Sequence, residues 1–516
     1  MELSRADHST SPPRIDVPRE YNAAYDLIER NLRAGRGAKL AFQDDAGTLT
    51  YAQLAERVNR FGSGLLALGL RMEDRVLIAM HDTADWPVAF LGAIKAGIVP
   101  VAVNTLLTTK DYEYMLSDSR AKALLVSEAL LPQFKPIVEK LPFLKHVIVS
   151  GASFNEVLAK GRAELAPAPT TRDDACFWLY SSGSTGMPKG TVHAHSSMIE
   201  TAELYARGVL GLAESDVVFS AAKLFFAYGL GNSLSFVLAA GASAVLMAER
   251  PTPASVFKRL TERRPTVFYG VPTLYAAMLA DANFPKREAL ALRRCVSAGE
   301  ALPPQIAQSF KERTGQDILD GIGSTEMLHI FLSNRPGDLR YGTTGRAVPG
   351  YELRLVDEQG QPVTPGELGE LEICGPTSAM YYWNNRAKSR STFAGPWTKS
   401  GDKYMQNADG YYVYGGRTDD MLKVSGIWVS PAEVEAALVA HPAVLEAAVV
   451  GQEDEQKLVK PKAFVVLKQG SKASEDELKA HVKEKLAPYK YPRWIEFASE
   501  LPKTATGKIQ RFKLRG

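Results

Sequence analysis

The chain has 516 residues, of which 45% are hydrophobic and 23% charged, a composition typical of a globular protein with roughly three domains. Its 61 lysines and arginines nearly balance 58 aspartates and glutamates, and a net charge of +3 is too small for the basic surface of a nucleic-acid-binding protein. Three widely separated cysteines indicate neither a disulfide framework nor a zinc site, and they favour a reducing compartment. No apolar run is long enough to cross a bilayer, and the N-terminus lacks the apolar stretch of a signal peptide. We therefore expect a cytoplasmic protein, monomer or homodimer, with small-molecule partners and no nucleic acid or membrane partner.

Apolar periodicity predicts the first elements of the chain. Between residues 54 and 68, apolar residues recur at spacings of three and four, which indicates an amphipathic helix that Gly69 is expected to end. Short apolar runs at 76–80 and 98–103 flank a second helical stretch, and this order of strand, helix and strand predicts parallel α/β layers. The same alternation returns in two later segments, 216–247 and 265–298.

A loop rich in glycine and hydroxyl residues follows an apolar run at 176–180. It reads YSSGSTGMPKG, residues 180–190, and offers backbone N–H groups, hydroxyls and the Lys189 ammonium, which suit phosphate oxygens. Pro188 before the lysine and Gly190 after it depart from the P-loop pattern, so an ordinary NTPase is disfavoured. Taken alone, such a loop is more often a surface turn, and its context must decide between the two interpretations.

The pattern changes beyond residue 340. Runs at 351–356 and 370–374, punctuated by glycine, are typical of a smaller β subdomain. The sequence SPAE at 430–433 predicts a capping box that opens a helix. A compact α+β unit is expected after it, with apolar runs at 444–450, 463–467 and 494–497 and a helix at 475–486. The predicted fold class is α/β, with a large N-terminal domain of layered α/β subdomains plus a β subdomain (1–418) and a small α+β C-terminal domain (419–516).

Six segments in order resemble the motifs of one enzyme superfamily. Besides the glycine-rich loop they are SAGE (297–300), GSTE (323–326), SGD (400–402), YGGRTDD (414–420) and PKTATGK (502–508). With them the chain resembles the adenylate-forming superfamily of acyl- and aryl-CoA synthetases, luciferases and peptide-synthetase adenylation domains. The resemblance implies that a carboxylate reacts with ATP and Mg²⁺ to give an acyl-adenylate, and that coenzyme A then attacks it after the mobile C-terminal domain rotates.

The resemblance also implies roles for single residues. The triphosphate would be surrounded by Ser181, Ser182, Gly183, Ser184, Thr185 and Lys189, and the nucleotide would further contact Gly299 and Glu300. Thr325 would contact phosphate, Glu326 would help to hold Mg²⁺, and Asp402 would bind the ribose with assistance from Arg417. Lys508 would bridge the carboxylate and α-phosphate oxygens, Asp419 would be the hinge, and Gly426 would approach the pantetheine of coenzyme A. From the residues alone, Lys508 could equally be a solvated lysine of a polar tail and Gly426 a hairpin glycine.

Two further segments bear on the acid. KLFFAYGLGN (223–232) and GSTEMLHIFLSN (323–334) resemble the subgroup of benzoate-CoA ligases and their hydroxy- and aminobenzoate relatives. The implied pocket residues are Phe226, Ala227, Tyr228, Gly229, Ile322, Gly323, His329 and Ile330. Tyr228 beside small neighbours favours a short planar acid, with benzoate as first choice and 4-hydroxybenzoate or 2-aminobenzoate as alternatives. His329 could instead be a scaffold histidine. Rival interpretations are a fatty-acid- or amino-acid-activating relative and a catalytically silent nucleotide-binding relative, although the latter would have little use for Lys508.

Overall fold

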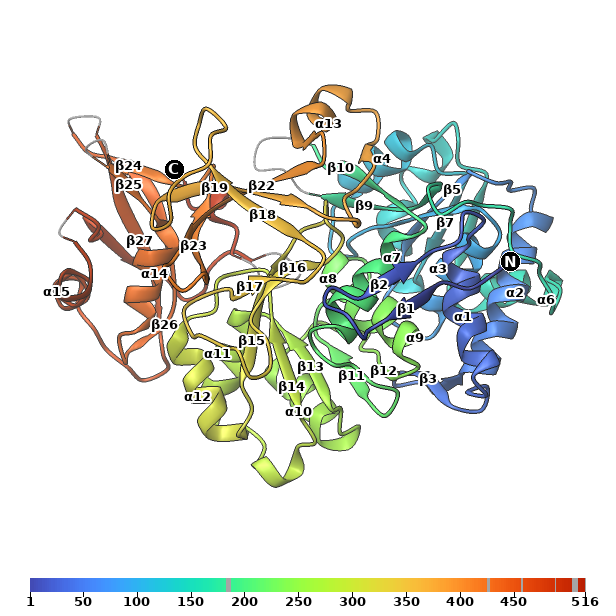
Figure 1. Cartoon of the computed structure of the whole chain (residues 1–516), viewed down its shortest axis with the longest axis horizontal. Coiled ribbons are helices and arrows are strands. Elements are labelled where there is room, and N and C mark those ends of the chain that lie inside the picture. The colour runs from blue at the N-terminus through green and yellow to red at the C-terminus, as the bar shows by residue number, and fades with distance from the viewer. Residues whose placement is uncertain (182–186, 425–426, 456–457, 488, 504–508, 516) are drawn as a thin grey trace.

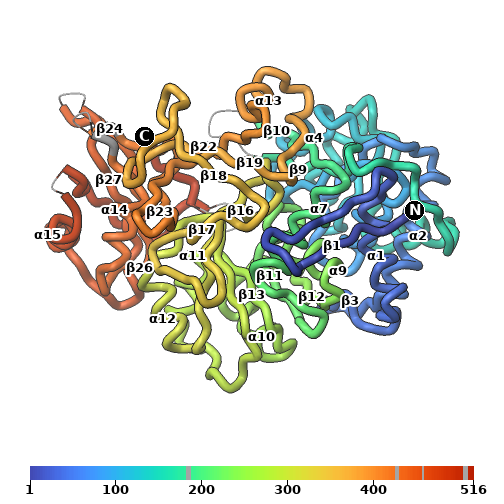
Figure 2. The backbone as a smooth tube through the Cα atoms, in the orientation of Figure 1, coloured from blue at the N-terminus to red at the C-terminus, as the bar shows by residue number. Residues whose placement is uncertain are grey.

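The computed structural model describes residues 1–181, 187–424, 427–455, 458–487, 489–503 and 509–515 of the chain (Figure 1). Its helices and strands form a large α/β body and a smaller unit at the C-terminal end, on the left in Figure 1. Figure 2 traces the backbone from the blue N-terminal part on the right to the red C-terminal part on the left. No helix in the described ranges is long and apolar enough to span a membrane.

The first of two large sheets has seven strands in the order β20-β10-β9-β6-β5-β7-β8. Their bounds are β5 (Arg75–Ala79), β6 (Val99–Ala102), β7 (Ala123–Val126), β8 (His146–Val149), β9 (Ala175–Ser181), β10 (Lys189–Ala194) and β20 (Tyr381–Tyr382). The five strands from β9 to β8 are parallel, whereas β10 and β20 join antiparallel at one edge. The predicted strand-helix-strand unit is confirmed, because α3 (Asp85–Lys95) connects β5 to β6. The predicted amphipathic helix is α2 (Tyr51–Ala67), and Gly69 follows its end with a φ of +88°.

The second large sheet has nine strands in the order β17-β16-β15-β14-β13-β11-β12-β3-β4. Their bounds are β3 (Leu40–Gln43), β4 (Thr48–Thr50), β11 (Val217–Ser220), β12 (Ser243–Val245), β13 (Val267–Gly270), β14 (Arg294–Ser297), β15 (Ile318–Gly323), β16 (Ile330–Ser333) and β17 (Arg346–Ala347). The six strands from β15 to β3 are parallel. The carboxyl ends of such strands are where open α/β sheets bind ligands, and β14 and β15 lead there into the SAGE and GSTE segments.

Helices fill the space around the two sheets. The largest buried cluster joins apolar residues from both sheets, such as Ile78 and Tyr269, with residues of the helices between them. These helices are α1 (Ala23–Arg33), α2, α3, α7 (Ser197–Thr201), the π-helical η3 (Ala202–Arg207), α8 (Ala227–Leu230), the π-helical η4 (Gly231–Ser235) and α9 (Phe236–Ala240). A second cluster packs α10 (Pro253–Glu262), α11 (Pro272–Ala280) and α12 (Pro304–Thr314) on the other face of the nine-stranded sheet. The layered α/β architecture is therefore as predicted.

The later part of the chain contains two smaller units. The predicted β subdomain is a five-stranded sheet of β18 (Glu352–Val356), β19 (Leu368–Cys374), β21 (Phe393–Ala394), β22 (Trp397–Gln406) and β23 (Tyr412–Arg417). The C-terminal unit contains β24 (Leu422–Val424), β25 (Ile427–Val429), α14 (Pro431–Val439), β26 (Val444–Glu453), β27 (Val459–Leu467), α15 (Glu475–Lys485) and β28 (Trp494–Phe497). It has a buried core of its own. Strand β23 ends at Arg417, beside the predicted domain boundary, which stays a prediction.

One local prediction is only half right. The Ser430 hydroxyl accepts a hydrogen bond from the Glu433 N–H at 3.1 Å, as a capping box requires. The Glu433 carboxylate, however, accepts hydrogen bonds from the Lys490 ammonium at 2.6 and 2.7 Å. A tertiary ion pair thus replaces the second half of the box.

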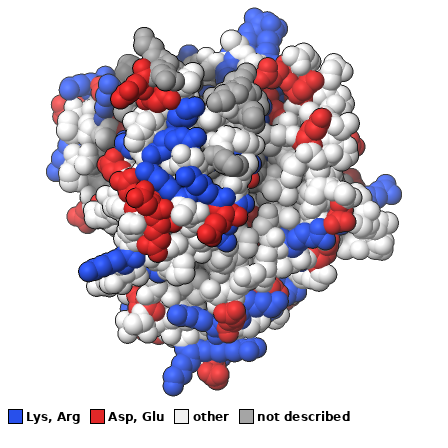
Figure 3. Space-filling model, turned by 90° about the vertical axis from the view of Figure 1, so that its left-hand side faces the viewer, with Lys and Arg blue, Asp and Glu red and all other residues white. Residues whose placement is uncertain are grey.

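The face of the molecule turned to the viewer in Figure 3 shows acidic and basic side chains intermixed, in keeping with the near-neutral net charge.

Candidate active site

The predicted phosphate-binding loop connects the antiparallel strands β9 and β10. Ser181 is the last residue of β9, Lys189 is the first of β10, and the two are partners in register. The backbone of Lys189 is therefore fixed at the start of β10. The loop residues Ser182, Gly183, Ser184 and Thr185, like Gly426 and Lys508, lie outside the described residues, so their roles stay predictions.

The GSTE segment is tied to this edge by hydrogen bonds. His193 on β10 donates its Nε2–H to the Thr325 carbonyl at 2.8 Å, and burial lowers the pKa of this histidine to about 4, so the ring is neutral. The Glu326 carbonyl accepts a hydrogen bond from the Ala379 N–H at 2.7 Å. The Tyr382 hydroxyl donates to Glu326 Oε1, also at 2.7 Å. Backbone and side-chain hydrogen bonds thus connect Thr325 and Glu326 to β10, which begins at Lys189, and to the segment that contains Tyr382.

Tyr382 contacts both charged residues of this group. The Lys189 ammonium lies over the Tyr382 ring, with Nζ 5.0 Å from the ring centroid. Burial lowers the pKa of Lys189, and the Glu326 carboxylate opposes that effect. The motif comparison of the sequence missed Tyr382 and His193, because neither belongs to the six segments. The aromatic run Tyr381-Tyr382-Trp383 was the one available signal for the former.

The predicted ribose-binding pair also comes together. Asp402 on β22 and Arg417 on β23 are partners in register, and Arg417 Nη1 lies 3.3 Å from Asp402 Oδ1. The Asp402 carboxylate raises the pKa of Arg417, and the Glu326 carboxylate contributes in the same direction. Asp419, the predicted hinge, is near enough to influence the pKa of Lys189. Lys189, Glu326, Asp402, Arg417 and Asp419 therefore form one electrostatic group.

The C-terminal tail reaches the SAGE segment. The Ile509 N–H donates a hydrogen bond to Glu300 Oε1 at 2.8 Å, and Ile509 is the residue that follows Lys508. Lys503 and Ile509, which flank residues 504–508, are antiparallel bridge partners. Gly299, next to Glu300, has a φ of +97°, a conformation that favours glycine.

The predicted acid pocket surrounds the start of α8. Phe226 precedes this helix, and Ala227, Tyr228 and Gly229 form its first turn. The space at Gly229 admits no side chain, because an added Cβ would lie 2.1 Å from the Lys223 carbonyl oxygen. The Tyr228 hydroxyl donates to the carbonyl oxygens of Gly270 at 3.3 Å and Val296 at 3.4 Å, at the ends of β13 and β14.

His329 lies beside Tyr228 and Asn232. Its Nε2 lies 3.0 Å from Asn232 Oδ1 and 3.2 Å from the Tyr228 carbonyl oxygen, and its ring centroid is 5.6 Å from that of Tyr228. Burial lowers the pKa of His329 to about 3, so the ring is neutral and its Nε2 carries the proton. Ile330 and Gly323 are partners between β16 and β15, and Ile322 precedes Gly323. His329 therefore supports the Tyr228 backbone whether or not it touches a substrate.

Comparisons with known proteins identify the family of the chain. The model of the AMP-binding enzyme family matches residues 28–383, and that of the AMP-binding enzyme C-terminal domain matches residues 433–508. The chain belongs to the AMP-binding enzyme family. This membership confirms the predicted superfamily and its architecture of a large α/β part with a separate small C-terminal domain.

Relatives of this AMP-binding enzyme are similar over nearly their whole length. The chain is 64% identical to the benzoate–CoA ligase of Thauera aromatica, over 99% of each chain. It is 50% identical to the 4-hydroxybenzoate–CoA/benzoate–CoA ligase of Rhodopseudomonas palustris, over 96% of this chain and 94% of that protein. A crystal structure of a benzoate CoA ligase from Burkholderia xenovorans LB400 has a TM-score of 0.92 and 56% identity, covering 96% of this chain and 100% of that one.

Proposed function

We propose that the protein is an ATP-dependent acid–thiol ligase that converts benzoate to benzoyl-CoA through benzoyl-adenylate. The observation that carries this proposal is the position of Tyr228: its hydroxyl donates to the Gly270 and Val296 carbonyls at the carboxyl ends of β13 and β14, and β14 leads into Glu300. The identity to ligases named for benzoate supports the choice of acid.

The first half-reaction needs charge neutralisation rather than a base. A benzoate oxygen attacks the α-phosphorus of ATP, a new P–O bond forms, and the bond to pyrophosphate breaks. The carboxylate is already a nucleophile, so the protein must mainly stabilise the phosphate charge. Lys189 and the loop 181–185 would contact the triphosphate, Thr325 would contact phosphate, and Asp402 with Arg417 would hold the ribose. The contact of Ile509 with Glu300 supports an arrangement in which Lys508 meets the reacting oxygens.

Mg²⁺ would enter with the nucleotide. The described residues contain no group of three or more histidine, cysteine or acidic side chains that could hold a metal on its own. One carboxylate, that of Glu326, suits a hard cation that keeps phosphate and water ligands. When bound, the ion would add positive charge at the phosphates.

In the second half-reaction the thiol sulfur of coenzyme A attacks the acyl carbon. A C–S bond forms, the bond between the acyl carbon and the AMP oxygen breaks, and the thiol proton leaves to solvent. We assign the domain rotation that admits the thiol to Asp419, with Gly426 near the pantetheine arm. Residues 1–418 and 419–516 would move as the two domains.

The pocket favours an unsubstituted ring. The Tyr228 hydroxyl proton is directed at backbone carbonyls, and the Nε2–H of His329 at Asn232 and the Tyr228 backbone. Neither of these protons is free for a ring substituent, so an apolar ring fits best. The name of the Rhodopseudomonas relative keeps 4-hydroxybenzoate as the second candidate.

The test is a panel of acids offered with ATP, Mg²⁺ and coenzyme A, with AMP and acyl-CoA quantified. Benzoate should give the highest kcat/KM among benzoate, 4-hydroxybenzoate, 2-aminobenzoate, cinnamate, acetate and octanoate. Tyr228→Ala should lower kcat/KM for benzoate and shift the ratio towards substituted benzoates, because it enlarges the pocket. An aliphatic acid leading the panel would overturn the pocket, and no AMP with any acid would overturn the ligase.

A further inference from the structure

Tyr382 stands between two opposite charges that come from different elements. Its ring faces the Lys189 ammonium at 5.0 Å, and its hydroxyl donates to Glu326 Oε1 at 2.7 Å. Tyr382 itself is 3% exposed. No ion pair links Lys189 to Glu326 within 4.0 Å, although both side chains are among those described.

The backbone around Tyr382 fixes this position. Tyr382 is the register partner of Thr191 on β10, two residues after Lys189. The Trp383 N–H donates to the Gly190 carbonyl at 2.7 Å, and the Ala379 N–H donates to the Glu326 carbonyl at 2.7 Å. The segment that carries Tyr382 is therefore bonded to both segments that carry the charges, and the tyrosine cannot shift without breaking these bonds.

A half-buried lysine and a glutamate that contact the same tyrosine attract each other more strongly than they would in water, because the local dielectric constant is lower. The effect of Glu326 on the pKa of Lys189 shows that the two already interact. If they closed into a salt bridge, each would neutralise the charge that the other offers to a substrate.

We propose that Tyr382 is a positioning residue that keeps Lys189 and Glu326 apart. Its ring face binds the ammonium as a cation–π partner, and its hydroxyl orients the carboxylate. The lysine is then available to phosphate oxygens and the glutamate to a nucleotide-bound cation. This inference rests on the proposed function, in which Lys189 and Glu326 have those two ligands.

The competing explanation is that Tyr382 serves only packing, since its ring also lies 5.1 Å from that of Phe393. Tyr382→Phe separates the two, because it keeps the ring and removes only the hydroxyl. Tyr381→Phe is the matched control, because Tyr381 is the exposed neighbour on the same strand. Glu326→Gln provides the background in which the residue 326 side chain can no longer form an ion pair with Lys189.

The first measurement is the affinity for ATP in EDTA, without metal or acid, by titration calorimetry. Tyr382→Phe should weaken binding about tenfold, because the released Glu326 carboxylate pairs with Lys189. In the Glu326→Gln background the same substitution should change the Kd less than about twofold, as should Tyr381→Phe in the wild-type background. An equal loss in both backgrounds, or no loss in either, would overturn the spacer role.

A second measurement does not depend on ATP. Pairing with Glu326 would raise the pKa of Lys189, so its acylation by acetic anhydride, followed by mass spectrometry, should slow several-fold in Tyr382→Phe and recover in Tyr382→Phe/Glu326→Gln. Unchanged labelling would overturn the inference while leaving the ligase proposal intact. If the variants showed the expected labelling but the wild-type protein formed AMP with no acid in the presence of Mg²⁺, the ligase proposal would be overturned and the spacer role retained.

Discussion

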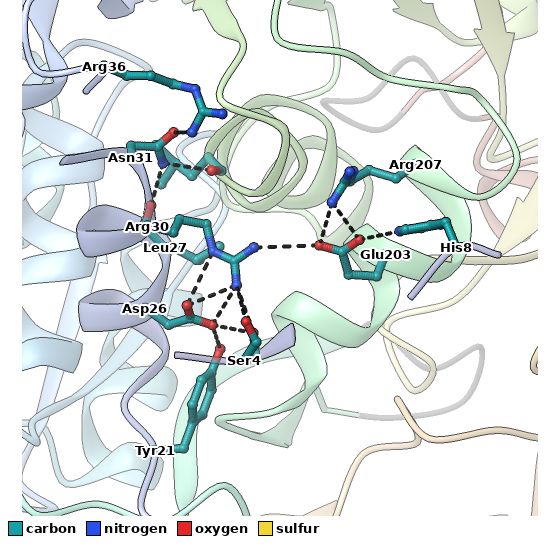
Figure 4. A network of polar contacts seen from close by, with 11 residues as sticks. Ser4, His8, Tyr21, Asp26, Leu27, Arg30, Asn31, Arg36, Glu203 and Arg207 are labelled. Atoms are coloured by element: carbon teal, nitrogen blue, oxygen red, sulfur yellow. Dashed lines mark hydrogen bonds and ion pairs between the residues drawn. The ribbon is translucent and has the colours of Figure 1, made fainter. Parts of the chain in front are cut away.

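Two buried or partly buried polar regions of this molecule differ in how their charges are arranged. In one, opposite charges form direct ion pairs, and in the other an aromatic side chain separates them. In the N-terminal part, Arg30 on α1 lies between two buried carboxylates, 2.9 Å from Asp26 Oδ1 and 3.6 Å from Glu203 Oε1 (Figure 4). Glu203 also meets His8 at 2.7 Å and Arg207 at 3.1 Å. In the candidate active site, Lys189 and Glu326 are kept apart by an aromatic side chain.

The difference separates structural charges from functional ones. A buried charge in full contact with its counter-ions is satisfied by the fold and has little left to offer a ligand. A charge held away from its nearest counter-ion remains incompletely satisfied, which is useful where a phosphate or a cation is to bind. Removing a charge should therefore cost stability in the first region and activity in the second.

The largest effect is expected from Arg30→Ala. The substitution leaves Asp26 and Glu203, 0% and 1% exposed, without their shared cation. Loss of one partner of a buried ion pair costs about 3–5 kcal/mol, so the thermal midpoint should fall by several degrees while kcat of the folded enzyme changes little. Arg33→Ala on the same helix is the control, because its side chain is 52% exposed and solvent screens its ion pair with Glu29. Equal shifts for the two variants would contradict the structural role of the network.

A smaller effect, and one that depends on pH, is expected from Glu200→Gln. Glu200 lies on α7, three residues before Glu203, and burial raises its pKa to about 7. Its Oε2 has no hydrogen-bond partner among the described residues. Between pH 4.5 and about 7, the Glu200 carboxyl is therefore protonated in the folded state and ionised in the unfolded state. The free energy of unfolding falls as pH rises through that window.

Across this pH window the wild-type protein should lose about 3 kcal/mol of its free energy of unfolding. The glutamine variant cannot ionise at residue 200 and should not show this loss. The thermal midpoint of Glu200→Gln relative to wild type should therefore rise between pH 5 and pH 8, whereas that of the exposed Glu113→Gln should stay constant. Parallel curves for Glu200→Gln and wild type would show that this carboxyl is ionised in both states.

Patterns within short segments of the sequence predicted much of the fold. The helix α2 and the strands β5 and β6 follow from apolar periodicity, which each segment carries within itself. Asp402 and Arg417 lie on consecutive antiparallel strands, which pair directly with each other. Two residues predicted from neighbouring motifs therefore lie close together in the structure. Only the second half of the capping box is absent, because the Lys490 ammonium, 57 positions away, binds the Glu433 carboxylate.

The parts that were not predicted depend on contacts between remote segments. Tyr382 reaches Lys189 only because β20 adds to the edge of β10, and a two-residue strand leaves no periodic signal. Arg30 and Glu203 likewise meet through tertiary packing. His329 was left with two possible roles, and its hydrogen bonds to Asn232 and the Tyr228 backbone now give it a scaffold function.

Of the three charge substitutions Arg30→Ala, Glu200→Gln and Lys189→Ala, the last has the smallest expected free-energy change and most sharpens the comparison. Removal of one preorganised cation from a site of charge development should lower kcat/KM for ATP about 100-fold, or about 2.7 kcal/mol. The free energy of unfolding should stay within about 0.5 kcal/mol of wild type, because the ammonium contacts a ring rather than a counter-ion. Lys388→Ala, which removes an exposed cation that acts on Lys189 only through its field, should change kcat/KM less than about threefold. A loss of stability as large as that of Arg30→Ala, with ATP kinetics unchanged, would place Lys189 among the structural charges and reverse the distinction between the two regions.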